Sequence, residues 1–183
     1  MIYAAEVTAG NELLQINELN RKNLKGNISF SEQEAQGFVT WLYTQELLQQ
    51  INSLSPAIIA KDDDKVIGYA LVTPIEAGSF HPDLQTMINN LEGLDYKGRP
   101  LSSYAYYIMG QVCIDENYRG KGVFDLMFNK HRELYSDKYE LLVTEISTTN
   151  YRSQKAHEKT GFTTIHTYRD ALDAWNVVVW DWR

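Results

Sequence analysis

The run Arg119-Gly120-Lys121-Gly122 holds the residue types best suited to binding a phosphate group. Glycines let successive backbone N–H groups point toward one ligand, and a helix start adds unpaired N–H donors and a positive dipole end. Pyrophosphate oxygens fit such a loop, and the side chains of Arg119 and Lys121 supply positive charge beside it. A tight turn from a strand into a helix would use the same two glycines without any ligand. The loop by itself leaves both interpretations open.

The segments on either side of this loop predict the elements that position it. Residues 104–114 are almost continuously apolar and aromatic, which is typical of a central strand covered on both faces, and Gly110 within them indicates a bulge. Residues 119–135 predict the loop followed by an amphipathic helix. Further along, the periodicity predicts a strand at 140–146, a helix at 153–160, and a closing hairpin of 162–168 with 175–182.

The N-terminal half predicts further elements around this centre. Residues 2–8 suit an edge strand, and residues 11–20 carry apolar side chains at helical intervals. Ser31 with Glu34 matches a capping box, and the apolar spacing after it predicts one long helix that continues towards Ser53. A charged turn between apolar runs predicts a hairpin of 57–60 with 66–73, and the less regular residues 74–103 include a short helix at 82–91.

Length and charge limit the class of protein. The 183 residues suit a single domain over residues 1–183, since a chain of this size buries about 70% of its unfolded surface and no linker or repeat divides it. A formal charge of −7 argues against nucleic-acid and membrane partners. The histidines and the single cysteine show no metal-ligand spacing, so we expect no metal. The first residues lack a signal-peptide pattern, which predicts a cytoplasmic protein.

A second motif spans residues 150–162 and reads Asn-Tyr-Arg-Ser-Gln-Lys-Ala-His-Glu-Lys-Thr-Gly-Phe. Within it, Gly161 suits a helix end and Phe162 the start of a buried strand, roles that require no chemistry. Together with residues 119–124 (Arg-Gly-Lys-Gly-Val-Phe), this motif resembles the GNAT acyltransferase superfamily. The superfamily's phosphate loop reads Arg/Gln-x-x-Gly-x-Gly/Ala, and its later motif has Asn, a small residue, an aromatic residue or His, and Lys-x-Gly-Phe. The resemblance covers residues 104–162, and Phe124 departs from it by replacing a small residue.

The resemblance implies an α+β (mixed α/β) fold with a central sheet of about seven mostly antiparallel strands flanked by helices. It implies acetyl-CoA as acyl donor and direct acetyl transfer, in a ternary complex, to a primary amine of a small molecule or peptide. Asn150 matches the residue that holds the pantetheine arm, and we expect the Phe124 ring to turn away from the diphosphate. The cofactor-binding residues that the resemblance implies are Val112, Ile114, Arg119, Gly120, Lys121, Gly122, Val123, Phe124, Asn150 and Ser153.

Two side chains match family positions for proton transfer. Glu145 has the spacing at which some ribosomal-protein N-terminal acetyltransferases carry a general-base Glu, and His157 replaces a Tyr that serves many relatives as general acid. An ammonium group must lose a proton before it attacks a thioester, and the departing thiolate gains one. A solvent-facing strand carboxylate and a structural helix histidine are the alternative interpretations. Cys113 lies inside an apolar stretch, which predicts a buried, inert thiol instead of a covalent intermediate.

The acceptor and the assembly are less defined by sequence. A monomer and a homodimer both fit, and a non-catalytic acyl-CoA-binding or regulatory module is the alternative function because the family Tyr is missing. We expect the N-terminal helices and the segment before the central strand to line the acceptor pocket. The side chains available there are Phe30, Trp41, Tyr43, Gln45, Phe80, Tyr104, Tyr106 and Tyr107.

Overall fold

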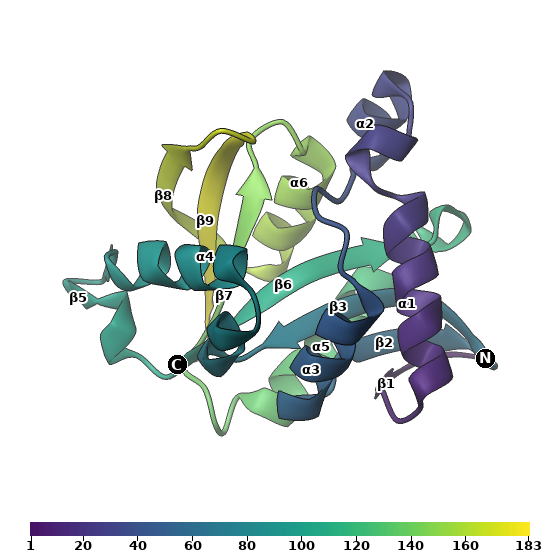
Figure 1. The fold of residues 1–183 in the computed structure, drawn as a ribbon, viewed down its shortest axis with the longest axis horizontal. Helices are drawn as coiled ribbons and strands as arrows, with labels where there is room; N and C mark the ends of the chain where they lie inside the picture. The colour runs from purple at the N-terminus through teal and green to yellow at the C-terminus, as the bar shows by residue number, and fades with distance from the viewer.

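A computed structural model describes residues 1–183 and places seven strands in one sheet (Figure 1). Their order is β1-β2-β3-β6-β7-β9-β8, and only β6 and β7 run parallel. A separate ribbon pairs β4 (Asp95–Tyr96) with β5 (Arg99–Pro100). The strands of the main sheet are β1 (Ile2–Glu6), β2 (Ile58–Asp62), β3 (Lys65–Thr73), β6 (Tyr106–Ile114), β7 (Leu141–Ser147), β8 (Thr163–Arg169) and β9 (Ala174–Asp181).

Helices cover both faces of this sheet (Figure 1), which confirms the expected mixed fold of a mostly antiparallel, seven-stranded sheet flanked by helices. None of the helices is long and apolar enough to cross a bilayer. Short 3-10 helices lie at Lys25–Asn27, Ile75–Phe80, Leu101–Ser103 and Glu116–Tyr118. The α-helices are α1 (Gly10–Lys22), α2 (Phe30–Gln36), α3 (Gln45–Leu54), α4 (Pro82–Glu92), α5 (Val123–Tyr135) and α6 (Tyr151–Thr160).

Side chains that alternate along β2 and β3 divide the core between the two faces. Ile59 and Tyr69 belong to a buried cluster with residues of α1 and α3. Ile58, one position before Ile59, and Ala70, one position after Tyr69, belong to the cluster built on α5. Burying each large aliphatic side chain contributes about 1.5–3 kcal/mol to the stability of the fold. The well-packed centre of the sheet therefore holds the residues at its edge in place.

The prediction of one long helix from Ser31 towards Ser53 is wrong. The capping box uses Ser29 and Glu32, and α2 ends after seven residues because Gly37 takes a φ of +73°. A new helix, α3, begins only after Thr44, whose hydroxyl caps it. Residues 37–44, which we call the strap, cross β6 without helical structure (Figure 1). Their apolar side chains therefore face the sheet instead of continuing a helix face.

The parallel strands β6 and β7 separate, and this opening positions the site. They pair only from Tyr106 to Ile108, although β6 continues to Ile114. The predicted bulge is confirmed, because the register between β3 and β6 shifts next to Gly110. A Cβ at Gly110 would lie 2.7 Å from the Thr73 hydroxyl oxygen, so glycine is required there.

Candidate active site

The glycine loop after β6 is open to a ligand. Gly120 and Gly122 have φ values of +73° and +78°, and no atom lies within 4 Å of a Cβ built on either. The first N–H groups of α5, from Val123 onward, have no partner within the helix, and the helix dipole is positive at this end. The loop therefore offers several free donors around an empty concave surface, which fits a diphosphate.

Arg119 holds the loop in place through three separate segments. Its Nε donates to the carbonyl of Ile114 at 2.9 Å. Its two terminal nitrogens donate to the side chains of Asn23, after α1, and Gln36, at the end of α2. These bonds use the guanidinium donors within the protein, so Arg119 positions the loop in addition to carrying charge. Lys121 is exposed, and its Nζ lies 5.5 Å from the centre of the Tyr118 ring.

A cavity of about 270 Å³, which we call the loop pocket, lies between the loop, the end of β6, the strap and α6. Its lining includes the cationic side chains of Arg119, Arg152 and Lys159, against a single carboxylate from Asp125. Positive charge favours phosphate groups in such a pocket. Lys121 does not line it, unlike the other loop residues that the sequence analysis named.

Phe124 takes the orientation expected of a bulky residue in the loop. Its ring stacks on Phe128 at 4.2 Å between centroids and meets the His157 ring edge-on at 5.0 Å. The ring thus packs between α5 and α6, where it contributes to the core cluster of α5. The backbone N–H of Phe124 stays at the start of the helix, where it has no helical acceptor.

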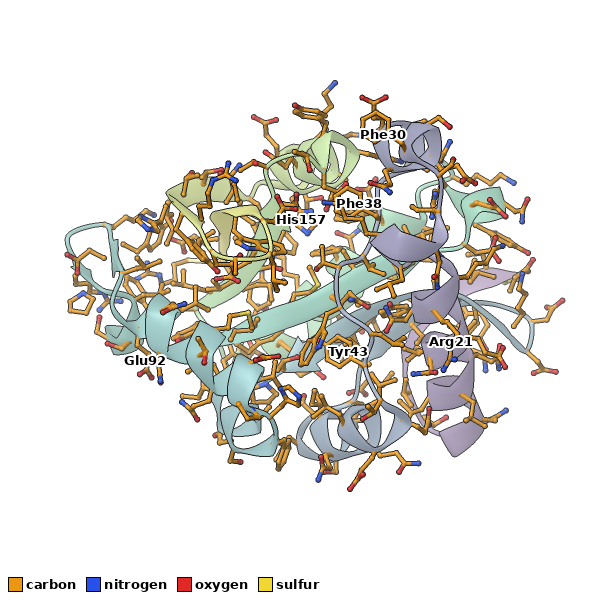
Figure 2. All side chains as sticks on the ribbon, turned by 45° about the horizontal axis from the view of Figure 1, so that its top comes forward. Arg21, Phe30, Phe38, Tyr43, Glu92 and His157 are labelled. Atoms are coloured by element: carbon orange, nitrogen blue, oxygen red, sulfur yellow. The ribbon has the colours of Figure 1, made fainter.

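A second cavity of about 300 Å³, the aromatic pocket, adjoins the first. Trp41, Tyr43, Tyr168 and Trp175 are among its aromatic lining residues. Both candidate proton-transfer residues, Glu145 and His157, line this pocket, and the two pockets share Phe38, Val39, Val112, Asn150 and Ser153. Phe38 and His157 both line the aromatic pocket and lie near each other in Figure 2, while Phe30 is exposed on α2.

Glu145 lies on β7 and is mostly buried, which distinguishes it from an ordinary surface carboxylate. Burial raises the pKa of its carboxyl to about 7; the Tyr168 hydroxyl opposes this rise, and the Asp170 carboxylate adds to it. One carboxylate oxygen, Oε1, is buried without a hydrogen-bond partner. A carboxyl group with a pKa near neutrality and a free oxygen can accept a proton from a ligand in the pocket.

His157 is 1% exposed and packs among the rings of Phe124, Phe128 and Phe162. Burial lowers the pKa of its imidazole to about 4. Its Nδ1 lies 2.8 Å from the carbonyl of Ser153, so the neutral ring donates there, and Nε2 remains a buried acceptor without a partner. The imidazole is therefore neutral at physiological pH.

Asn150 joins α6 to the strap. Its side-chain oxygen caps α6 by accepting from the Ser153 N–H at 3.4 Å, and its Nδ2 donates to the Phe38 carbonyl at 2.9 Å. On the other side of the strap, Val39 exchanges backbone hydrogen bonds with Asn23 and Lys25. Because the strap lines both pockets, Asn150 fixes a wall common to them.

Replacing Asn150 with Asp should keep the helix cap but remove the donor to Phe38. We expect KM to rise by up to about 10-fold for both substrates, since a hydrogen bond from a neutral donor contributes about 0.5–1.5 kcal/mol. Asn150→Ala, the matched control, loses the cap as well and should unfold at a lower temperature. Steady-state kinetics and thermal unfolding measure both effects. An Asn150→Asp enzyme with unchanged KM values would show that the strap does not depend on this bond.

Sequence reasoning named part of the aromatic pocket and missed another part. Trp41 and Tyr43 line it as expected, whereas the other named side chains do not. Tyr168 and Asp170 also line this pocket, but the sequence did not predict them there. Alternation along the predicted 162–168 strand could have placed Tyr168 on the face of the sheet that holds the site. The expected aromatic or polar side chains that lie outside both pockets are Phe30, Gln45, Phe80, Tyr104, Tyr106 and Tyr107.

The comparison with protein families agrees with this geometry. The model described as the acetyltransferase (GNAT) family matches residues 29–162, which is most of the chain. The chain belongs to the GNAT family. The protein is accordingly an acetyltransferase, and enzymes of this family use acetyl-CoA as acyl donor. The open loop, its free N–H donors and the cations of the loop pocket fit the diphosphate of that donor.

Solved structures share the fold at low sequence identity. The ribosomal-protein-S18-alanine N-acetyltransferase from Escherichia coli has a TM-score of 0.65 at 10% identity, covering 99% of this chain and 94% of that one. A GNAT-family acetyltransferase from Streptococcus agalactiae has a TM-score of 0.68 at 14% identity, covering 100% and 96%. A putative acetyltransferase from Salmonella typhimurium, solved with acetyl-CoA, has a TM-score of 0.64 at 10% identity, covering 100% and 94%. No curated protein matches the sequence.

Proposed function

We propose that this GNAT enzyme transfers an acetyl group from acetyl-CoA directly to a primary amine of a small molecule or peptide, with Glu145 as general base. The observation that carries this proposal is the Glu145 carboxyl, mostly buried in the aromatic pocket with a pKa raised to about 7 and an unpaired oxygen. An amine acceptor is an ammonium ion at neutral pH, so it needs such a base before it can attack. The loop pocket and the aromatic pocket meet, which lets donor and acceptor occupy the protein together.

Acetyl-CoA supplies a thioester whose acyl carbon accepts the amine. Glu145, in its ionised form, takes a proton from the ammonium group, and the shared residues between the pockets hold the reacting groups close together. In this proposal the nitrogen releases a second proton as the amide forms, and water passes a proton to the departing thiolate. At a pKa of about 4, roughly one His157 ring in a thousand is protonated at pH 7. In this proposal His157 therefore lines the pocket as a neutral, buried side chain with one acceptor nitrogen.

Direct transfer predicts that the single cysteine is dispensable for chemistry. Burial raises the pKa of the Cys113 thiol to about 12, so almost no thiolate is available to accept an acyl group. We expect Cys113→Ala to keep kcat within about twofold of the wild type, since a buried inert thiol contributes only packing. Initial rates measured against both substrates should give intersecting reciprocal plots. Parallel plots together with an inactive Cys113→Ala enzyme would instead support a covalent intermediate.

The proposal is tested most directly by acetyl-CoA binding and by product formation. A ligand of the native state raises the unfolding temperature by mass action, so acetyl-CoA and coenzyme A should raise it while ATP and NAD should not. A panel of primary amines should then release free coenzyme A thiol above the uncatalysed rate. Binding without any product would support the alternative, a non-catalytic acyl-CoA-binding or regulatory module.

A further inference from the structure

The two pockets carry opposite charge. The loop pocket is lined by three cationic side chains and one carboxylate, whereas the aromatic pocket contains three carboxylates and neither lysine nor arginine. A phosphate-bearing donor and a cationic acceptor would each meet complementary charge in such an arrangement, and a carboxylate on the acceptor would be repelled. The carboxylates of the aromatic pocket are Asp83, Glu145 and Asp170.

Two of these carboxylates, Asp83 and Asp170, are exposed, while Glu145 lies deeper. Neither Asp83 nor Asp170 forms an ion pair with a lysine or arginine; the one basic side chain within 4 Å is His81, whose Nδ1 lies 3.8 Å from Asp83. Asp170 uses one oxygen, Oδ1, to accept from the N–H groups of Leu172 and Asp173. By contrast, Asp173, three residues on, is paired with a lysine and does not line the pocket.

The interior of the pocket also matches an ammonium group. Oε1 of Glu145 and Nε2 of His157 are both buried without partners, and Nε2 of the neutral ring is an acceptor. Trp41 and Tyr43, whose ring centroids lie 4.6 Å apart, both line this pocket, and aromatic rings attract cations. The volume of about 300 Å³ is at the lower end of the range for small-molecule sites.

We propose that the acceptor is a small diamine, which presents one amino group to Glu145 while its second ammonium group lies at the mouth beside Asp83 and Asp170. This inference rests on the proposed function, because it assigns a substrate class to the same site. The reacting ammonium group loses one proton to Glu145, and its nitrogen then forms a bond to the acetyl carbon while the carbon–sulfur bond breaks. The nitrogen loses a second proton, which reaches the departing thiolate through water, so coenzyme A leaves as the thiol. The second ammonium group takes no part in the reaction and contributes only to binding.

The test compares acceptors of equal length that differ in one terminal group. 1,4-Diaminobutane, 1-aminobutane and 4-aminobutanoate are assayed with saturating acetyl-CoA, and the series is repeated with three-, five- and six-carbon chains. We expect kcat/KM of the best diamine to exceed that of the monoamine of equal length about 10-fold, and that of the amino acid of equal length about 100-fold. These ratios correspond to the attraction or repulsion expected from two partly solvated carboxylates. A monoamine or amino acid that reacts as well as the diamine at every length would overturn the proposal.

Variants test whether Asp83 and Asp170 bind the second ammonium group or act only through the net charge of the protein. Asp83→Asn with Asp170→Asn should reduce the diamine-to-monoamine ratio to about 1, and Asn at 170 keeps the oxygen that accepts from the turn. The matched control, Asp95→Asn with Asp137→Asn, removes the same net charge at exposed positions outside both pockets and should preserve the ratio. A preference that survives the first double variant contradicts the assignment of the second ammonium group.

The readouts distinguish the failure of this inference from that of the proposed function. Acetylation of monoamines without any diamine preference would defeat the inference and leave the acetyltransferase mechanism standing. A rise in unfolding temperature with acetyl-CoA but no product from any amine would defeat the proposed function, and the diamine proposal with it.

Discussion

Glu145→Gln is expected to lower kcat/KM for amine acetylation by about 100-fold to 1,000-fold at pH 7, within the range of about 10²–10⁴-fold that a positioned general base contributes. Glutamine keeps the shape of the side chain but cannot accept a proton. The effect should appear in kcat as well as in kcat/KM, because the lost interaction belongs to the chemical step. The unfolding temperature shift caused by acetyl-CoA should remain, which separates loss of the base from loss of donor binding.

The pH dependence of the reaction gives a sharper test of this role. Burial raises the pKa of Glu145 to about 7, so the wild-type rate should rise through pH 7 as the carboxyl ionises. In the Gln variant this inflection should be absent, and the deficit should shrink at alkaline pH, where the acceptor is already deprotonated. An unchanged pH–rate profile in the variant would mean that another group or a water network acts as base.

Glu145 also makes the stability of the enzyme depend on pH. Its pKa is raised from 4.5 to about 7 in the folded protein, so the folded state binds more protons between these values. The free energy of unfolding should therefore fall as pH rises from 4.5 to 7, by about 3 kcal/mol if the full shift is expressed. Glu145→Gln should lack this loss and be more stable than the wild type at pH 8. Chemical denaturation at pH 4.5 and pH 8 measures the difference.

Gly122→Ala is expected to raise KM for acetyl-CoA about 10-fold to 100-fold, equivalent to losing one charge-assisted hydrogen bond of about 1.5–3 kcal/mol. Gly122 has a φ of +78°, and the added methyl group would enter open space at the lining of the loop pocket. The left-handed conformation also costs alanine about 1–2 kcal/mol, which should displace the N–H donors at the start of α5. Titration of acetyl-CoA by kinetics and by thermal unfolding measures the change.

Gly98→Ala is a matched control for this substitution. Gly98 has a φ of +81° and equally open space around its Cβ position, but it lies in the β4–β5 turn, outside both pockets. Both variants should lose similar stability, and only Gly122→Ala should bind acetyl-CoA more weakly. An equal loss of affinity in the two variants would assign the effect to general destabilisation instead of the loop.

Local sequence patterns predicted most elements of the fold because they depend on neighbouring residues. The apolar stretch before Ile114, the glycines of the loop and Gly161 at the end of α6 all appear where the periodicity placed them. The prediction of a long helix through residues 37–44 was wrong because it relied on the helical spacing of apolar residues and gave too little weight to Gly37. The left-handed φ of Gly37 ends α2. The strap is then extended because Val39 pairs with Leu24, just after the end of α1.

Apart from the helix predicted through residues 37–44, the order of elements, the glycine loop and the family could all be predicted from the sequence. The environment of the candidate site residues, in contrast, follows from the tertiary structure. The Arg119 guanidinium donates hydrogen bonds to Asn23 and Gln36, which lie 96 and 83 positions away in the chain. The raised pKa of Glu145 likewise depends on burial in the aromatic pocket, with a contribution from the Asp170 carboxylate after β8. Loop shape follows from local backbone preferences, whereas burial and charge at a side chain follow from segments distant in sequence, and these set its chemistry.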